Sequence, residues 1–330
     1  MKRFFKNLAL YALPFIAVLL VFFTFEPYDY FCVRGDAIYL SRPLSTMRQV
    51  VLGKASNKLV FGDSRLANLN ADYIEEITGE RYTMMAFGGS TFGEQMELFR
   101  FYTEHAVPEK IVFELTYYMC RGTQDSGRIP AVRQLAESPW KFATNFSNWI
   151  QAAEAIRWKS KNLINEARGR EDLLEYPEDQ TDYTIVYELT TERIDGDRAD
   201  LYEYSEMIAG ALKNYDLQRA TLAQIDELVS YCEANGVELI FVAPPMHETM
   251  FRRAVAPSGV DPIRQYLLEY AKERATVYDM EFLNDYTRDE ANFYDGFHLV
   301  PEQKKTLARL IFTDTDEHSE AIRRYVKEPR

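Results

Sequence analysis

Short apolar runs recur along the chain, and each is followed by a segment of helix length. The runs cover residues 59–61, 82–87, 110–116, 238–243 and 277–279. Each run is short enough for one buried strand, and strands that alternate with helices form a parallel sheet covered by helices on both faces. The sequence therefore predicts an α/β fold built on a parallel sheet.

The helices between these runs are marked by their boundaries. Gly236 ends one of them as a helix C-terminus requires, and Pro301 suits the first turn of another. The predicted helices cover residues 71–78, 92–105, 217–235 and 262–275, and a last helix begins near residue 301.

The stretch at residues 8–25 is apolar and carries no charge. As a helix it spans about 27 Å, close to the hydrocarbon core of a bilayer at about 30 Å. A cleaved signal peptide and a buried core helix are the alternatives, but the stretch lacks a small-residue cleavage site and a polar face. Basic residues before it and aromatic residues after it favour a single-pass anchor in the cytoplasmic membrane with the N-terminus inside.

This interpretation divides the chain into three parts. Residues 1–31 are the predicted cytoplasmic tail and transmembrane anchor, residues 32–57 a juxtamembrane segment, and residues 58–330 an extracytoplasmic α/β domain. Within that domain, residues 118–215 break the alternation of strands and helices. They hold an amphipathic stretch at 139–163, a charged segment and a β-like run at 184–190. We expect them to form a helical cap inserted over the carboxyl edge of the sheet.

The formal net charge of −13 argues against nucleic acid as a partner, because no basic cluster beyond the first residues matches a run of phosphates. The three cysteines, Cys32, Cys120 and Cys232, lack metal-ligand spacing, and no nucleotide-binding or zinc-protease motif occurs. The sequence implies no metal and no cofactor.

The first apolar run ends in Gly-Asp-Ser-Arg, which places Ser64 between a buried strand and a helix. In an α/β fold this position lies above the carboxyl edge of the sheet, where helix amides face a bound ligand. Ser64 is therefore a candidate nucleophile. Taken alone, the same residues also fit an ordinary turn.

A serine nucleophile needs a base and a group that orients the base. Among the four histidines, His298 has a carboxylate three residues upstream, Asp295, in a glycine-containing turn before the last helix. This spacing lets Asp295 reach one ring nitrogen while the other faces Ser64. A capped turn is the alternative for this pair, and His247, after the fourth run, is the rival base or a residue lining the substrate site.

Gly88 and Gly89 follow the second apolar run. Because glycine lets a backbone amide approach a bound oxygen closely, the amides of Ser64 and Gly89 are candidates for an oxyanion hole. An ordinary turn between a strand and a helix is the alternative.

These three elements, in this order, resemble the SGNH/GDSL hydrolase superfamily. The resemblance implies a flavodoxin-like three-layer α/β/α sandwich and ester chemistry, with Asp295 and His298 serving Ser64. In members of this superfamily, a conserved segment after the third strand normally contains an Asn that donates to the oxyanion. This chain has no Asn directly after its third apolar run. Thr116 or Tyr117 is a candidate substitute.

The anchor and the missing Asn resemble most the membrane-tethered DltD-like branch. That resemblance implies a membrane-bound O-acyltransferase as partner and an acylated carbohydrate, envelope polysaccharide or teichoic acid as substrate. Water as acceptor gives hydrolysis, and a sugar hydroxyl gives transfer. Arg65 is expected either to hold an anionic group of the substrate or to form a surface ion pair. The alternative function is a non-catalytic scaffold or polysaccharide-binding subunit of the same fold.

Overall fold

The computed structural model describes residues 2–26, 28–31, 42–121, 127–169, 199–217, 219–315 and 318–327. The predicted β-like run at residues 184–190 lies outside the described residues.

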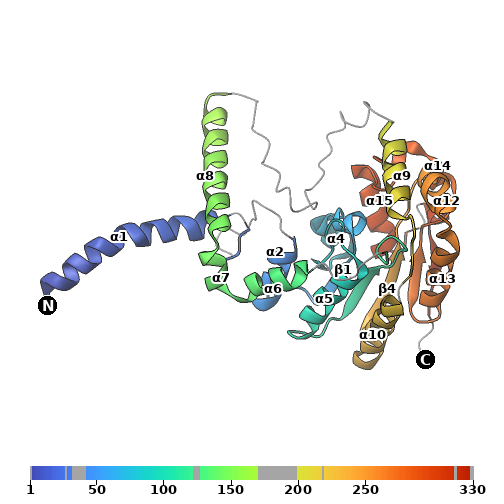
Figure 1. Ribbon diagram of the computed structural model, residues 1–330, viewed down its shortest axis with the longest axis horizontal. Helices are drawn as coiled ribbons and strands as arrows, with labels where there is room; N and C mark the ends of the chain where they lie inside the picture. Colours follow the sequence, from blue (N-terminus) through green and yellow to red (C-terminus); the bar gives the residue numbers. More distant parts are fainter. Residues whose placement is uncertain are drawn as a thin grey trace.

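A six-stranded sheet forms the centre of the molecule (Figure 1). Its strand order is β2-β1-β3-β4-β5-β6, and every neighbouring pair is parallel except β5 with β6. The first five strands have the order of flavodoxin-like sheets. The strands are β1 (Lys58–Phe61), β2 (Thr83–Met84), β3 (Lys110–Glu114), β4 (Glu238–Ala243), β5 (Thr276–Asp279) and β6 (Arg323–Tyr325).

Successive side chains of the central strands point to opposite faces of the sheet, as the pleat requires. Phe61, Phe113 and Phe241 belong to one buried cluster with residues of α5 (Phe92–Thr103), α10 (Arg219–Asn235) and α13 (Asp261–Lys272). Val60, Val112 and Ile240 belong to a second cluster with residues of α4 (Ala71–Thr78) and α15 (Pro301–Phe312). The predicted α/β class with a mainly parallel sheet between helices is confirmed.

Several elements were not predicted. Helix α2 (Arg42–Val51) occupies much of the expected juxtamembrane segment, and the short antiparallel strand β6 closes the edge of the sheet. The remaining short elements are α3 (Ser64–Ala67), α11 (Glu248–Met250), the π-helix η2 (Phe251–Val255), α12 (Ala256–Ser258), α14 (Asp285–Arg288) and the 3₁₀ helices η3 (Glu290–Asn292) and η4 (Ser319–Ala321).

The described part of the predicted cap is helical. The amphipathic stretch forms α7 (Pro139–Thr144) and α8 (Phe146–Ala167), separated by Asn145, whose side chain accepts from the Ser147 amide at 3.1 Å. Helix α8 packs against α1, and α6 (Arg128–Glu137) packs against α2 (Figure 1). Arg128, at the start of α6, donates to the Gly89 carbonyl at 3.3 Å, in the loop that follows β2. Helix α9 (Ala199–Ala211) packs against α11 and η2, which follow the carboxyl end of β4. The limits of the cap, residues 118–215, stay a prediction.

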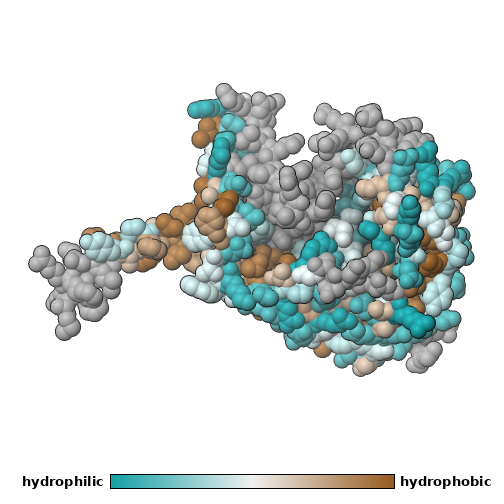
Figure 2. All heavy atoms as spheres, in the orientation of Figure 1, coloured by the Kyte–Doolittle hydropathy of each residue, from teal (hydrophilic) through white to brown (hydrophobic). Residues whose placement is uncertain are grey.

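Helix α1 (Lys2–Phe25) projects from the body of the molecule (Figure 1). Between residues 10 and 21 most of its exposed side chains are apolar (Figure 2). Its C-terminal end is held by aromatic contacts, including Phe22 stacked on Trp149 of α8 with ring centroids 4.0 Å apart. Across the described ranges, no helix combines the length and the apolar character needed to cross a membrane.

Candidate active site

Ser64 occupies the first position of the short helix α3, directly after β1. Asp63 caps this helix, because its side-chain oxygen accepts from the Arg65 amide at 2.9 Å. The cap turns the chain sharply at the carboxyl end of the strand. Ser64 itself stays half-buried between two buried neighbours.

His298 lies opposite Ser64, in the loop that leads into α15. Its Nε2 is 2.7 Å from Ser64 Oγ, and its Nδ1 is 2.7 Å from Asp295 Oδ2. With Nδ1–H donating to the carboxylate, Nε2 accepts from the serine hydroxyl. The structure thus brings the three predicted residues into one hydrogen-bonded line, although 234 positions separate Ser64 from His298.

The loop itself fixes the orientation of Asp295. The other oxygen of this carboxylate accepts from the amides of Phe297 at 2.9 Å and His298 at 2.8 Å. Burial alone would raise the pKa of Asp295, but His298 and these two amides overcome that effect and lower it. Asp295 is therefore ionised at neutral pH and is suited to stabilise an imidazolium.

The loop after β2 is tied to the turn that holds Ser64. The carbonyl of Gly62 accepts from the Phe87 amide at 3.1 Å and from Ser90 Oγ at 2.8 Å. Between these contacts lie the predicted oxyanion residues Gly88, which is buried, and Gly89, which is exposed and has φ +65°. Gly89 thus adopts a conformation that favours glycine. The loop neighbours the nucleophile, and its oxyanion role stays a prediction.

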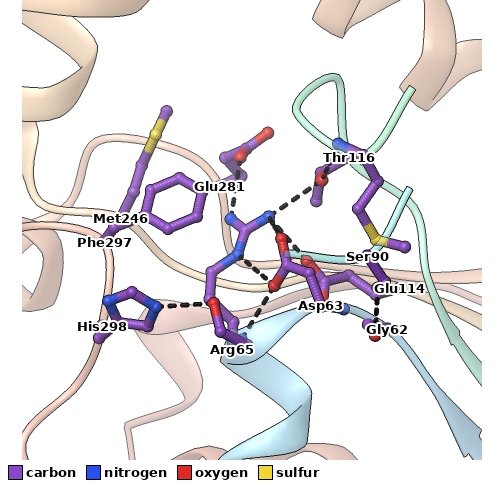
Figure 3. A network of polar contacts seen from close by, with 12 residues as sticks. Gly62, Asp63, Arg65, Ser90, Glu114, Thr116, Met246, Glu281, Phe297 and His298 are labelled. Atoms are coloured by element: carbon purple, nitrogen blue, oxygen red, sulfur yellow. Dashed lines mark hydrogen bonds and ion pairs between the residues drawn. The ribbon is translucent and has the colours of Figure 1, made fainter. Parts of the chain in front are cut away.

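The side chain of Arg65 is only 2% exposed, and its guanidinium lies among Asp63, Glu114 and Glu281 (Figure 3). Its Nη2 donates to Glu114 Oε1 at 2.7 Å and to Thr116 Oγ1 at 2.9 Å, and its Nε donates to Asp63 Oδ1 at 3.4 Å. Nη1 lies 3.6 Å from Glu281 Oε1. The guanidinium therefore connects the loops that follow β1, β3 and β5.

The acids around Arg65 are themselves buried. Burial raises the pKa of Glu114 well above its usual value, and Asp63 adds to the effect while Arg65 opposes it. Burial raises the pKa of Glu281 to about 7, against the opposing effects of Arg65 and Arg264. For Arg65, the surrounding carboxylates outweigh burial and raise the pKa, so the guanidinium stays charged.

These contacts correct the expectation for Arg65. A surface ion pair is wrong, because the side chain is buried, and its guanidinium faces internal carboxylates. Of the suggested Asn substitutes, Thr116 accepts from Arg65, and the buried Tyr117 hydroxyl donates to Met246 Sδ at 3.5 Å.

His247 is also buried, and its Nδ1 accepts from the Thr249 amide at 3.2 Å as the cap of α11. The structure brings His298, and not the rival His247, to Ser64.

Several residues of the site had not been predicted. Glu114 had a visible signal, since it is an acid inside an otherwise apolar run and its carboxylate also accepts from the Asp63 amide at 3.0 Å. Tyr204 of α9, whose ring centroid is 5.8 Å from that of His298, had no such signal, because its helix is distant in sequence.

No protein-family model and no curated protein matches the chain. Among solved structures, the chain is similar to one described as "a putative acylhydrolase" from Bacteroides fragilis NCTC 9343. The two share 15% sequence identity with a TM-score of 0.39, over 77% of this chain and 84% of that chain. The resemblance to SGNH hydrolases and their DltD-like branch stays a prediction.

Proposed function

We propose that the protein is a serine-dependent ester hydrolase or acyltransferase that works through an acyl-enzyme on Ser64. One observation carries the proposal, namely the continuous hydrogen-bonded line from Ser64 through His298 to Asp295, with both distances at 2.7 Å. Nucleophile, base and orienting carboxylate in this arrangement are the components of serine acyl transfer.

In the proposed reaction Ser64 Oγ attacks the carbonyl carbon of an ester while His298 Nε2 takes the hydroxyl proton. The tetrahedral intermediate collapses, its C–O bond to the alcohol breaks, and His298 returns the proton to the departing alcohol oxygen. An acceptor hydroxyl then loses its proton to His298 and attacks the acyl carbon, the bond to Ser64 Oγ breaks, and His298 returns the proton to Ser64 Oγ. Water as acceptor yields a free acid, and a sugar hydroxyl yields a new ester.

Backbone amides are the proposed partners of the negative oxygen that forms during this attack. The amide of Ser64 belongs to the first turn of α3, and the loop with Gly88 and Gly89 neighbours it through the contacts to Gly62. Removal of one such donor typically costs about 2.7–4 kcal/mol of transition-state stabilisation.

The biological setting is proposed from the sequence. The apolar stretch at residues 8–25 supports an anchor that holds the α/β domain outside the cytoplasm. The resemblance to the DltD-like branch supports acyl esters of an envelope polysaccharide or teichoic acid as substrates, and a membrane-bound O-acyltransferase as partner.

Hydrolysis of 4-nitrophenyl acetate tests the chemistry directly. We expect turnover by the wild-type protein and its loss in Ser64→Ala, with the folded state intact. Ser147→Ala is the matched control, because Ser147 is an exposed serine of α8 outside the site. Equal turnover by wild type and Ser64→Ala would contradict the proposal and favour a non-catalytic scaffold of the same fold.

A further inference from the structure

A cleft opens near the nucleophile turn, at the edge of the sheet formed by β2. Its volume is about 400 Å³, within the range of about 300–1,000 Å³ that is usual for ligand sites. Leu69, Tyr82 and Met84 belong to its lining, together with residues of α2 and α4 and with Lys304 of α15. Ser64, His298 and Asp295 do not line it, so the cleft is separate from the triad.

Five polar side chains of the cleft have no hydrogen-bond or ion-pair partner within the described part of the chain. They are two amides, two carboxylates and one guanidinium: Gln49, Asn68, Asp72, Glu75 and Arg81. Other polar groups of the lining are engaged, as when Thr46 Oγ1 donates to the Met84 carbonyl at 3.2 Å. All but Asn68 are exposed, so the cleft presents donors and acceptors that face water and are accessible to a ligand.

The chemistry of these groups selects the ligand. The amides both donate and accept, the carboxylates accept, and the guanidinium donates. A sugar hydroxyl also donates and accepts, so a chain of sugars can pair with every member of the set. An apolar acyl chain would displace the water bound to these groups and offer no hydrogen bonds in return, which costs binding free energy. The two acids of the lining, Asp72 and Glu75, are balanced by two bases, Arg81 and Lys304, so the cleft has no net charge to attract a strongly charged ligand.

The cleft begins one helical turn from the nucleophile. Asn68 caps the C-terminus of α3, and its amide donates to the Ser64 carbonyl at 3.1 Å. Asn68 and Lys304 also line the small cavity that contacts Phe297 and His298. Burial lowers the pKa of Lys304, and the charge of Asp295 opposes this effect.

We infer that this cleft binds the neutral, hydroxyl-rich carbohydrate part of the substrate, while the ester group that it carries reaches Ser64. The inference rests on the proposed ester chemistry and adds to it the residues that recognise the alcohol portion. The polymer chain then runs from the nucleophile turn along α4 towards α2.

Binding tests the inference without turnover. Ser64→Ala protein is titrated by calorimetry with cellopentaose, xylopentaose and penta-N-acetylchitopentaose. We expect at least one of these neutral probes to bind, and Glu75→Gln and Gln49→Ala in this background to weaken binding roughly three- to tenfold each, the usual effect of one hydrogen bond.

Glu76→Gln is the matched control, because Glu76 is an exposed acid of the same helix outside the cleft. We expect it to leave binding at the level of the Ser64→Ala parent. Binding of none of the three probes, or binding that Glu75→Gln and Glu76→Gln weaken equally, overturns the inference.

Kinetics separate this inference from the proposed function. For Glu75→Gln we expect the ratio of kcat/KM on partially O-acetylated xylopentaose to kcat/KM on 4-nitrophenyl acetate to fall roughly three- to tenfold. An unchanged ratio, with turnover that still depends on Ser64, overturns the cleft and leaves the ester chemistry standing. If carbohydrate binding depends on Glu75 but turnover does not depend on Ser64, the proposed ester chemistry is wrong. The role of the cleft in that chemistry is then wrong as well.

Discussion

The guanidinium carbon of Arg65 lies 4.1 Å from the centre of the Phe297 ring. Arg65 directly follows the nucleophile in sequence, and Phe297 directly precedes the base. A cation over an aromatic face is an attractive contact, and here it joins two loops that come from opposite ends of the chain. We therefore expect Arg65 to act as a positioning residue that holds Ser64 and His298 at their distance.

Two replacements of Arg65 separate its contribution to stability from its contribution to turnover. Arg65→Ala leaves buried carboxylates without their cation, and we expect a loss of about 3–5 kcal/mol in the free energy of unfolding. Arg65→Lys keeps the charge but loses the planar fork and the ring contact, so we expect a folded protein whose kcat is about ten- to a hundredfold lower at similar KM. Denaturant unfolding and steady-state kinetics measure the two effects.

The control for this experiment is the exposed pair between Arg100 and Glu227. Its side chains are 42% and 44% exposed, so Arg100→Ala should cost less than about 1 kcal/mol. Comparable stability losses in Arg65→Ala and Arg100→Ala would contradict a buried cation that holds the loops.

Asp295→Asn tests the orientation of the base. The Asn oxygen can still accept from the Phe297 and His298 amides, whereas its NH₂ group would face His298 Nδ1 and favour the tautomer with a proton on Nε2. That tautomer cannot accept the Ser64 proton, so we expect kcat to fall by about 10²–10⁴ with the fold intact. Asp289→Asn alters a similar cap, in which Asp289 accepts from the Ala291 amide at 3.0 Å outside the site, and should leave kcat unaffected. An equal kcat in both variants would refute the role of Asp295.

Glu281 makes stability depend on pH. Burial raises its pKa in the folded protein to about 7 from an ordinary value of 4.5. Between these two pH values the folded state holds a proton that the unfolded chain releases, so the free energy of unfolding falls as pH rises through this window, by up to about 3 kcal/mol.

We expect Glu281→Gln to reduce this decrease, as measured by urea unfolding at pH values from 4 to 8, while Glu114, whose pKa burial also raises, accounts for a remaining part. Glu269→Gln, at an acid whose side chain is 66% exposed, should retain the wild-type decrease. A pH dependence that Glu281→Gln leaves unchanged would mean that another group causes it.

Gly62 is fixed by close packing. A Cβ on Gly62 would lie 2.6 Å from Glu114 Oε2, a buried atom that accepts from the Asp63 amide. We expect Gly62→Ala to destabilise the fold by about 1–3 kcal/mol and to lower turnover, since the carboxylate beneath the nucleophile turn must move.

Gly210 provides the contrast to Gly62, because a Cβ there would meet no atom within 4 Å and the residue lies inside α9. Gly210→Ala should stabilise the protein by about 0.4–1 kcal/mol. Thermal unfolding of both variants measures the two changes in stability. An unchanged stability of Gly62→Ala would contradict the close packing of Gly62 against Glu114.

Much of the sheet was predictable because its central strands are apolar and bounded by turns. The predicted run at residues 238–243 coincides with β4, and the helix at 71–78 coincides with α4. Strand β6 was missed because Arg323-Arg324-Tyr325 has no apolar run and pairs only at the edge, antiparallel to β5.

The triad was predictable because its members have local signals: a strand followed by Gly-Asp-Ser, and a carboxylate three residues before a histidine. The place of Arg65 was not predictable, because it depends on Glu114 and Glu281, which lie far along the chain and reach the guanidinium only through the order of the strands. The sequence of a single strand does not reveal which strand will lie beside it in the sheet.

The most direct test of the account is reaction of the purified protein with a fluorophosphonate probe, followed by mass-spectrometric mapping of the labelled peptide. An activated Ser64 predicts a label on Ser64, and its absence in His298→Ala, because the base at 2.7 Å is what makes the hydroxyl nucleophilic. Failure of the folded wild-type protein to react, or labelling of Ser64 that persists in His298→Ala, would contradict the account.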